Sequence, residues 1–117
     1  MNILIIEDDD SIRESLDMYL TEEGCDVEVA DMGWEGVRKF STAHVALVIL
    51  DVHLPDLNGF DVLDKLIKHD GQARVIMITA FHDENTMNRA FEKGVCKYIK
   101  KPIDVNLLDN AIVEALK

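Results

Sequence analysis

Five polar side chains of this sequence could do chemistry together. Each stands within two residues of the end of an apolar run: Glu7, Asp8, Asp51, Thr79 and Lys101. Carboxylates are ligands that Mg²⁺ prefers in proteins, and a carboxylate can also attack phosphorus to form an aspartyl phosphate. A hydroxyl and an ammonium group can bind the oxygens of a phosphoryl group. These residue types therefore suit phosphoryl transfer assisted by a metal ion, provided that the fold brings them together.

The apolar run at residues 45–50 leads directly into Asp51. A run of this kind without polar alternation predicts a strand that is buried on both faces. Pro55, Asn58 and Gly59 follow and supply the residue types of a turn. Because ligands of open α/β sheets bind outside the carboxyl ends of the strands, Asp51 is a candidate site residue.

The three acidic residues predict a metal site. At close range Glu7, Asp8 and Asp51 would repel one another, and a hard divalent cation with oxygen ligands removes that repulsion. We expect Asp8 and Asp51 to bind Mg²⁺, or Mn²⁺ in its place, directly and Glu7 to bind it through water. The backbone carbonyl of His53 would complete the ligands that the protein supplies.

The remaining sequence alternates between strand and helix patterns. Runs of apolar or alternating residues predict five strands, at 2–6, 25–30, 45–51, 74–79 and 95–100. Apolar residues at helical spacing predict a helix after each strand, from Ser11 to the residues before Gly24 and over 33–40, 61–68, 83–93 and 105–116. Ser11 and Glu14 have the spacing of a capping box, and Asp104 can cap the last helix. In the second helix, Trp34 is expected to face inward.

The strand patterns predict the order of the sheet. The first, third and fourth strands are apolar throughout and belong in the middle, whereas the second and fifth are mixed and belong at the edges. The order 2-1-3-4-5 meets this condition and gives a doubly wound, flavodoxin-like α/β fold with a parallel sheet and five helices on both faces. Its switch point lies between the first and third strands, where Glu7, Asp8 and Asp51 meet.

The length, net charge and composition of the chain exclude several classes of function. The 117 residues suffice for one domain, 1–117. A net charge of −11 argues against binding nucleic acid, because phosphates would be repelled. No run approaches the length of a membrane span and no signal peptide is recognisable, so we expect a cytoplasmic protein without a membrane partner. Cys25 and Cys96 predict buried reduced thiols. The remaining histidines are expected in solvent: His44, His69 and His82.

In order and spacing, these motifs resemble a response-regulator receiver domain of two-component signalling, and the resemblance runs from end to end. It is carried by Ile3-Leu4-Ile5-Ile6-Glu7-Asp8-Asp9, Leu50-Asp51-Val52-His53-Leu54-Pro55 with Gly59, Ile78-Thr79-Ala80 and Tyr98-Ile99-Lys100-Lys101-Pro102. The resemblance implies that Asp51 accepts a phosphoryl group from a phosphohistidine. The donor would be a sensor histidine kinase or a histidine phosphotransfer protein.

The resemblance also implies roles for the neighbouring residues. Glu7 and Asp8 would hold Mg²⁺, and Lys101 would pair with the phosphoryl group. Thr79 would be the switch hydroxyl, and Tyr98 would turn inward as Thr79 moves toward the phosphate. The bond between Lys101 and Pro102 is typically cis in the family. The surface of the fourth helix, fifth strand and fifth helix would then change and bind a partner, without any organic cofactor.

A few positions depart from the family pattern. Glu7 stands where Asp is commoner, and Leu54 and Leu57 stand where Met is frequent. His53 and Phe81 occupy variable positions beside the site, where they would affect the lifetime of the phosphoryl group. The sequence leaves open whether the receiver stands alone or belongs with an output domain, and it identifies neither the kinase nor the effector.

The resemblance implies a signalling switch that catalyses only its own phosphorylation and slow dephosphorylation, and three other functions are alternatives to it. A Mg²⁺-dependent phosphohydrolase similar to haloacid-dehalogenase-like phosphatases would need a second Asp where His53 stands. A flavodoxin-like FMN carrier would need a first loop rich in Ser, Thr and Gly. A degenerate receiver that only docks on a partner would lack site residues that are present here.

Overall fold

The computed structural model describes residues 1–81 and 83–117, so the prediction for His82 lies outside the described residues. The elements alternate along the chain as β1 (Asn2–Ile6), α1 (Asp10–Glu22), β2 (Asp26–Ala30), α2 (Gly33–Thr42), β3 (Leu47–Asp51), α3 (Gly59–His69), β4 (Val75–Thr79), α4 (Glu84–Glu92), β5 (Lys97–Lys100) and α5 (Val105–Ala115). The type and order of these elements confirm the prediction. Their ends differ from it by one or two residues.

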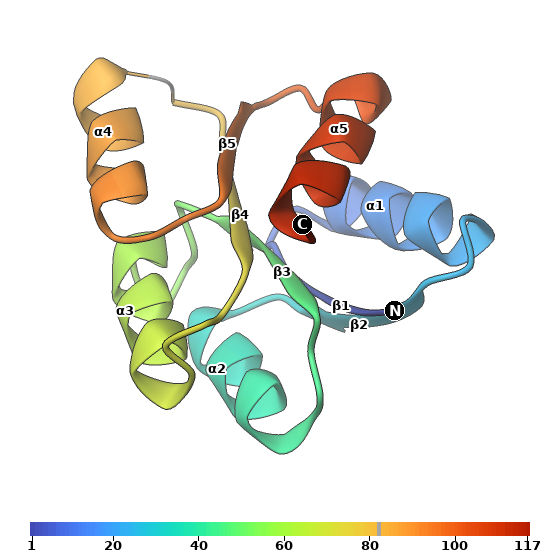
Figure 1. Ribbon diagram of the computed structural model, residues 1–117, viewed down its shortest axis with the longest axis horizontal. Helices are drawn as coiled ribbons and strands as arrows, with labels where there is room; N and C mark the ends of the chain where they lie inside the picture. Colours follow the sequence, from blue (N-terminus) through green and yellow to red (C-terminus); the bar gives the residue numbers. More distant parts are fainter. Residues whose placement is uncertain (82) are drawn as a thin grey trace.

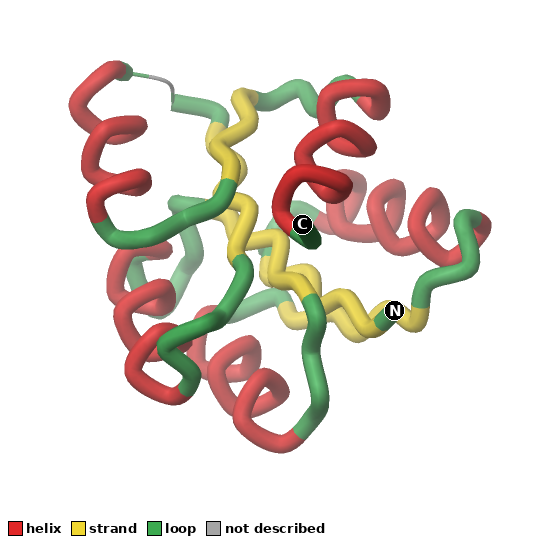
Figure 2. Tube along the Cα trace, viewed as in Figure 1, coloured by secondary structure: helices red, strands yellow, loops and turns green. Residues whose placement is uncertain are grey.

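The sheet has the predicted topology. Its five strands are parallel and lie in the order β2-β1-β3-β4-β5, and Figure 2 shows them as one layer between helices. β3 and β4 are buried along their whole length, as continuous apolar strands should be. β2 alternates between exposed and half-buried residues until Ala30, which agrees with its place at an edge.

Helices cover both faces of the sheet and form two separate cores. On one face, Leu4, Val48 and Met77 pack against residues of α2, α3 and α4. On the other face, strand residues such as Ile5 and Ile49 pack against α1 and α5. Figure 1 shows the same division, with α1 and α5 on one side of the strands and the other three helices opposite. The three middle strands, β1, β3 and β4, are thus shielded from water along nearly their whole length.

α2 lies so close to its neighbours that glycines occupy two of its three buried positions, the third being Phe40. A Cβ at Gly36 would overlap the side chain of Ile6, and one at Gly33 would lie 2.8 Å from a side-chain atom of α3. Trp34 is 55% exposed, and the Nζ atom of Lys65 lies 4.7 Å from the centroid of its ring. The prediction that Trp34 faces inward was wrong, because the apolar pattern gave no weight to the glycines.

The start of α1 also differs from the prediction. Asp9 is the N-cap residue, and its Oδ1 accepts the N–H of Ile12 at 3.0 Å. Ser11 therefore lies inside the first turn instead of capping it. Asp and Ser are about equally favoured as caps, so composition alone did not distinguish them. At α5, Asp104 caps the helix as predicted and accepts two N–H groups of the first turn.

The structure contains neither a disulfide nor a membrane-spanning helix among the residues that it describes. Cys25 and Cys96 are both free and half-buried. They precede β2 and β5, the opposite edges of the sheet, so they do not form a disulfide within this fold. Across residues 1–81 and 83–117, no helix has both the length and the apolar character needed to cross a bilayer.

Candidate functional site

The register of the parallel strands brings the predicted residues to one edge of the sheet. Asp51 pairs with Ile78, so Thr79 lies one residue beyond it on β4, and Thr79 pairs with Lys100. Backbone hydrogen bonds to the neighbouring strands also hold Glu7 and Lys101, which follow β1 and β5. The Glu7 N–H donates to the carbonyl of Ala30 at 3.0 Å, and the Lys101 N–H donates to the carbonyl of Thr79 at 2.7 Å.

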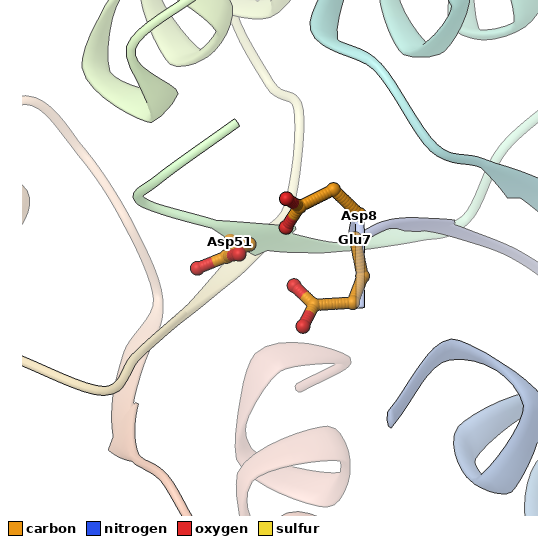
Figure 3. A group of neighbouring side chains, drawn as sticks. All are labelled: Glu7, Asp8 and Asp51. Atoms are coloured by element: carbon orange, nitrogen blue, oxygen red, sulfur yellow. The ribbon is translucent and has the colours of Figure 1, made fainter. Parts of the chain in front are cut away.

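Three carboxylates converge at this edge. One oxygen from each of Glu7, Asp8 and Asp51 lies within 4.8 Å of the others, and Figure 3 shows the three carboxyl groups gathered beside the ends of β1 and β3. Glu7 is fully buried and Asp51 is 3% exposed, whereas Asp8 is open to solvent. In the part of the chain that the structure describes, this is the one cluster of three or more acidic, histidine or cysteine side chains that could hold a metal ion.

Lys101 lies beside the buried carboxylates. Its Nζ atom is 2.7 Å from Glu7 Oε1 and 3.3 Å from Asp51 Oδ2, and the side chain is 13% exposed. Glu7 therefore has an ion-pair partner that the sequence analysis did not assign to it. If all three carboxylates are ionised, one ammonium leaves two negative charges in excess, which is the charge that a divalent cation would balance.

Burial and neighbouring charges shift the pKa values of this group. Burial raises the pKa of Glu7 to about 8, and the nearby Asp51 carboxylate acts in the same direction, while Lys101 acts to lower it. For Lys101, burial acts to lower the pKa, but the Glu7 and Asp51 carboxylates outweigh it and the pKa is raised. The pair therefore favours a charged Lys101 next to an acid whose ionisation is opposed.

The chemistry of these residues fits a hard divalent cation. Glu7 Oε2 is buried, and no residue of 1–81 or 83–117 donates a hydrogen bond to it. A buried oxygen of this kind needs a partner, and a cation or a water bound to one would supply it. The donors of the cluster are all carboxylate oxygens, as Mg²⁺ prefers. The His53 N–H donates to Asp51 Oδ1 at 3.3 Å, and the role of its carbonyl as a ligand stays a prediction.

Of the two proposed switch residues, Thr79 lies at this edge, whereas Tyr98 lies two residues before the end of β5 and pairs with Met77. Thr79 is fully buried, and its Oγ1 both donates to the carbonyl of Phe81 and accepts its N–H, each at 3.0 Å. Tyr98 is half-buried and packs against the core on the side of α2, α3 and α4. Burial raises the pKa of the Tyr98 phenol, as does the charge of Asp83, whereas a hydrogen bond with the Thr79 side chain lowers it.

Two further predictions concern the rim of the site. The peptide bond between Lys101 and Pro102 is cis, as the family resemblance implied. His53 is exposed, and its ring meets that of Phe81 edge to face, with the centroids 5.1 Å apart. Phe81 is 69% exposed, so the two rings form part of the outer rim of the site.

Arg13 supports the acidic loop after β1 and was not among the predicted site residues. Its Nη1 donates to the carbonyls of Glu7 at 3.1 Å and Asp8 at 3.4 Å, and its Nη2 pairs with Asp10. An arginine three residues after an acid on a helix is a recognisable pair. Its reach to two loop carbonyls depends on the turn between strand and helix, which no spacing rule gives. Asp56 was not among the predicted site residues either.

Comparisons with known proteins agree with this fold and site. Residues 3–113 match the family model of the response regulator receiver domain. The chain is 36% identical over 117 residues to a cyclic di-GMP phosphodiesterase of Thermotoga maritima, covering 100% of this chain and 31% of that protein.

Two solved structures illustrate the likeness. A CheY-like receiver domain protein from Methanospirillum hungatei has a TM-score of 0.93 and 32% identity, with 98% of this chain and 92% of that chain covered. The CheX-CheY-BeF3-Mg²⁺ complex from Borrelia burgdorferi gives a TM-score of 0.96 at 28% identity, covering 100% and 90%. In contrast, the chain spans between 31% and 51% of the first curated relatives it matches.

Proposed function

The chain belongs to the family of response regulator receiver domains of two-component signalling, and from this premise we propose that Asp51 is its phosphoacceptor. The phosphoryl donor would be a phosphohistidine of a sensor histidine kinase or of a histidine phosphotransfer protein. The whole of residues 1–117 would act as one receiver domain. It would serve as a switch and not as a turnover enzyme, because it would catalyse only its own phosphorylation and a slow dephosphorylation.

One observation carries this proposal. The Asp51 carboxylate is 3% exposed, lies in a cluster with Glu7 and Asp8, and has the Lys101 ammonium 3.3 Å away. A carboxylate that served only to cap a helix would not need a second acid and a lysine from other strands. The surroundings supply what a carboxylate nucleophile requires, which is oriented oxygens and positive charge near the incoming oxygens.

The proposed reaction is a transfer from nitrogen to oxygen. An Asp51 carboxylate oxygen forms a bond to phosphorus as the bond from phosphorus to the donor imidazole nitrogen breaks, and the imidazole leaves with that electron pair. Lys101 would bind an oxygen of the transferred group, and Thr79 would donate its hydroxyl hydrogen to another after leaving the Phe81 carbonyl. A Mg²⁺ or Mn²⁺ ion bound by Glu7, Asp8, Asp51 and the His53 carbonyl would neutralise charge on the phosphoryl oxygens.

The signal would leave the site through Thr79 and Tyr98. Thr79 stands at the end of β4 and Tyr98 lies on β5. A movement of either side chain would therefore change its packing against α4 and α5. Phosphorylation adds charge and acceptor oxygens at Asp51, which would shift the population of the surface formed by α4, β5 and α5. That surface would bind the downstream effector or an output domain of the same protein.

The test is intact mass after incubation with acetyl phosphate, with and without Mg²⁺, for wild type and Asp51→Asn. A gain of one phosphoryl group that needs Mg²⁺ and is absent in Asp51→Asn is the expected result. A variant that is labelled at the wild-type rate would exclude Asp51 as the phosphoacceptor. Steady release of phosphate from a small phosphoester would favour a phosphohydrolase, and no labelling from acetyl phosphate or a phosphohistidine donor would favour a docking module.

A further inference from the structure

The loop between β3 and α3, residues 52–58, is closed at its base. The Gly59 N–H donates to the carbonyl of Val52 at 2.6 Å, and His53 and Asn58 form an isolated antiparallel bridge. A Cβ at Gly59 would lie 2.5 Å from the carbonyl oxygen of Asp51, so the start of α3 rests directly on the end of β3. The loop therefore leaves and returns at the phosphoacceptor, and its outer turn needs support from elsewhere.

Asp56 supplies that support by reaching α2. Its Oδ1 accepts the Gly33 N–H at 2.7 Å and its Oδ2 accepts the Trp34 N–H at 3.0 Å. The N-cap residue of α2 is Met32, whose side chain makes no capping bond. The first turn of α2 is thus capped by a carboxylate from another loop, in place of a cap from its own sequence.

The charge on Asp56 is favoured by this arrangement. Burial acts to raise the pKa of its carboxyl, but the backbone N–H groups of Trp34 and Gly33 outweigh it and hold the pKa below its usual value. A negative charge at the positive end of a helix is favourable. The contact is also packed, since a Cβ at Gly33 would lie 3.0 Å from Leu57 Cβ.

We propose that Asp56 is a positioning residue that fixes the β3–α3 loop against α2, so that Mg²⁺ binding at the acidic cluster and the order of the first turn of α2 are linked. This inference rests on the proposed function, because it takes His53 as a backbone ligand. His53 lies three residues before Asp56 within the same closed loop. Any tightening of the loop around a bound cation is passed through Asp56 to Trp34.

Linkage requires that the effect run both ways. If Mg²⁺ tightens the first turn of α2 through Asp56, then loss of the Asp56 contact must weaken Mg²⁺ binding. Residues that support metal ligands from behind typically change metal affinity by about 10-fold to 100-fold when they are replaced. Asp56 acts on one ligand of several, so a loss of about tenfold is expected for Asp56→Ala.

The chain carries its own reporter for this link. Trp34 is the single tryptophan of the chain. Its backbone N–H donates to Asp56, and its exposed ring lies next to Lys65. Mg²⁺ would be titrated by calorimetry and, in parallel, by Trp34 emission. The variants are Asp56→Ala, Asp56→Asn and Asp70→Ala. Asp70 is the matched control, because it is also a loop aspartate that accepts a backbone N–H, here the single one of Gln72, but it follows α3 at the opposite end of the sheet.

In wild type and Asp70→Ala, the emission of Trp34 should change with the midpoint that calorimetry gives. Asp56→Ala should bind Mg²⁺ about tenfold more weakly and lose the emission change even when calorimetry shows the site to be full. Asp56→Asn keeps one acceptor oxygen without the charge, so its affinity and emission change should lie between. If Asp56→Ala does not fold, Asp56→Asn alone tests the link between Mg²⁺ binding and α2.

Opposite results are equally clear. Equal Mg²⁺ affinity and equal emission change in wild type and Asp56 variants would overturn the link, as would equal losses in Asp56→Ala and Asp70→Ala, which would reflect charge alone. Labelling of wild type by acetyl phosphate tests the proposed function separately. A wild-type protein that binds Mg²⁺ but is labelled by neither acetyl phosphate nor a phosphohistidine donor would contradict the function and still test the link, and one that does not bind Mg²⁺ would overturn both.

Discussion

Lys101 and Glu7 show how single side chains make the site possible. Glu7 is fully buried, and a buried carboxylate is costly without a partner. The Lys101 ammonium at 2.7 Å is that partner, and the same group lies 3.3 Å from Asp51. Lys101 thus serves two carboxylates from a third strand end, and any ligand that takes Lys101 away from Glu7 must leave Glu7 another partner. A cation at the cluster would be one.

Gly59 is the residue where a small change should have a large effect. An added Cβ would lie 2.5 Å from Asp51 O, 2.6 Å from Val52 Cα and 2.8 Å from Val52 O, and these backbone atoms cannot rotate away. We expect Gly59→Ala to lower the free energy of unfolding by about 1–3 kcal/mol, as overpacking does. Urea unfolding followed by circular dichroism measures it.

Gly71 is the matched control, because nothing lies within 4 Å of a Cβ built there. Gly71→Ala should change the free energy of unfolding by no more than about 0.5 kcal/mol in either direction. Equal stability of Gly59→Ala and Gly71→Ala would mean that the start of α3 can move away from β3, contrary to the closed loop described above.

At the scale of elements, α1 and α5 are joined by one defined contact across the same face of the sheet. The Tyr19 phenol donates to the Asp109 carboxylate, with 2.8 Å to each oxygen. This hydrogen bond raises the pKa of Tyr19 to about 12, with smaller contributions from burial and from the charges of Asp109 and Glu23. The contact therefore couples the packing of two helices to the protonation of one phenol.

The sign of the resulting pH dependence follows from the raised pKa. Between about pH 10 and about pH 12 the folded protein keeps the Tyr19 proton that the unfolded chain loses. The contribution of the contact is thus complete below about pH 10 and is lost as the pH rises to about 12. The stability difference between wild type and Tyr19→Phe, measured by urea unfolding along this range, should fall toward zero. A constant difference would contradict the contact.

The elements were predictable wherever a repeating pattern carried the information. The continuous apolar strands β1, β3 and β4 determined the sheet order, and that order brought Asp51 near Glu7. Sequence patterns did not predict the side-chain positions that depend on close packing between elements distant in the sequence. Trp34 faces outward because glycines hold the inward positions of α2, and no regular spacing joins Asp56 to a helix 22 residues earlier.

Site residues were predictable for a related reason. Side chains at the carboxyl ends of parallel strands share one edge, so Glu7, Asp51 and Lys101 could be placed without coordinates. The partner of Lys101 within that edge could not be, because the choice between two carboxylates depends on side-chain rotamers. Arg13 escaped prediction for the same reason, since its bonds go to backbone carbonyls that a sequence does not distinguish.

At the scale of the whole molecule, negative charge is spread over the surface and is also concentrated in one cluster of carboxylates. The chain has a net charge of −11, which destabilises a compact state through self-repulsion. Part of that repulsion is concentrated in Glu7, Asp8 and Asp51, where simple salt screens it poorly because two of the three are buried. Monovalent salt and Mg²⁺ should therefore act on different charges, the first on the surface and the second on the cluster.

Thermal unfolding separates these two effects. A ligand that binds only the folded state stabilises it by about 2.7 kcal/mol at a concentration of 100 times its Kd, which corresponds to a rise in Tm of about 10 °C for a domain of this size. We expect MgCl₂ to raise Tm by about this amount beyond NaCl of equal ionic strength. In Asp51→Asn the protein without Mg²⁺ should itself be more stable, because one repelling charge is gone, and the excess effect of MgCl₂ should shrink. An equal effect of both salts on wild type would place the stabilisation on the surface charge and remove the cluster as a metal site.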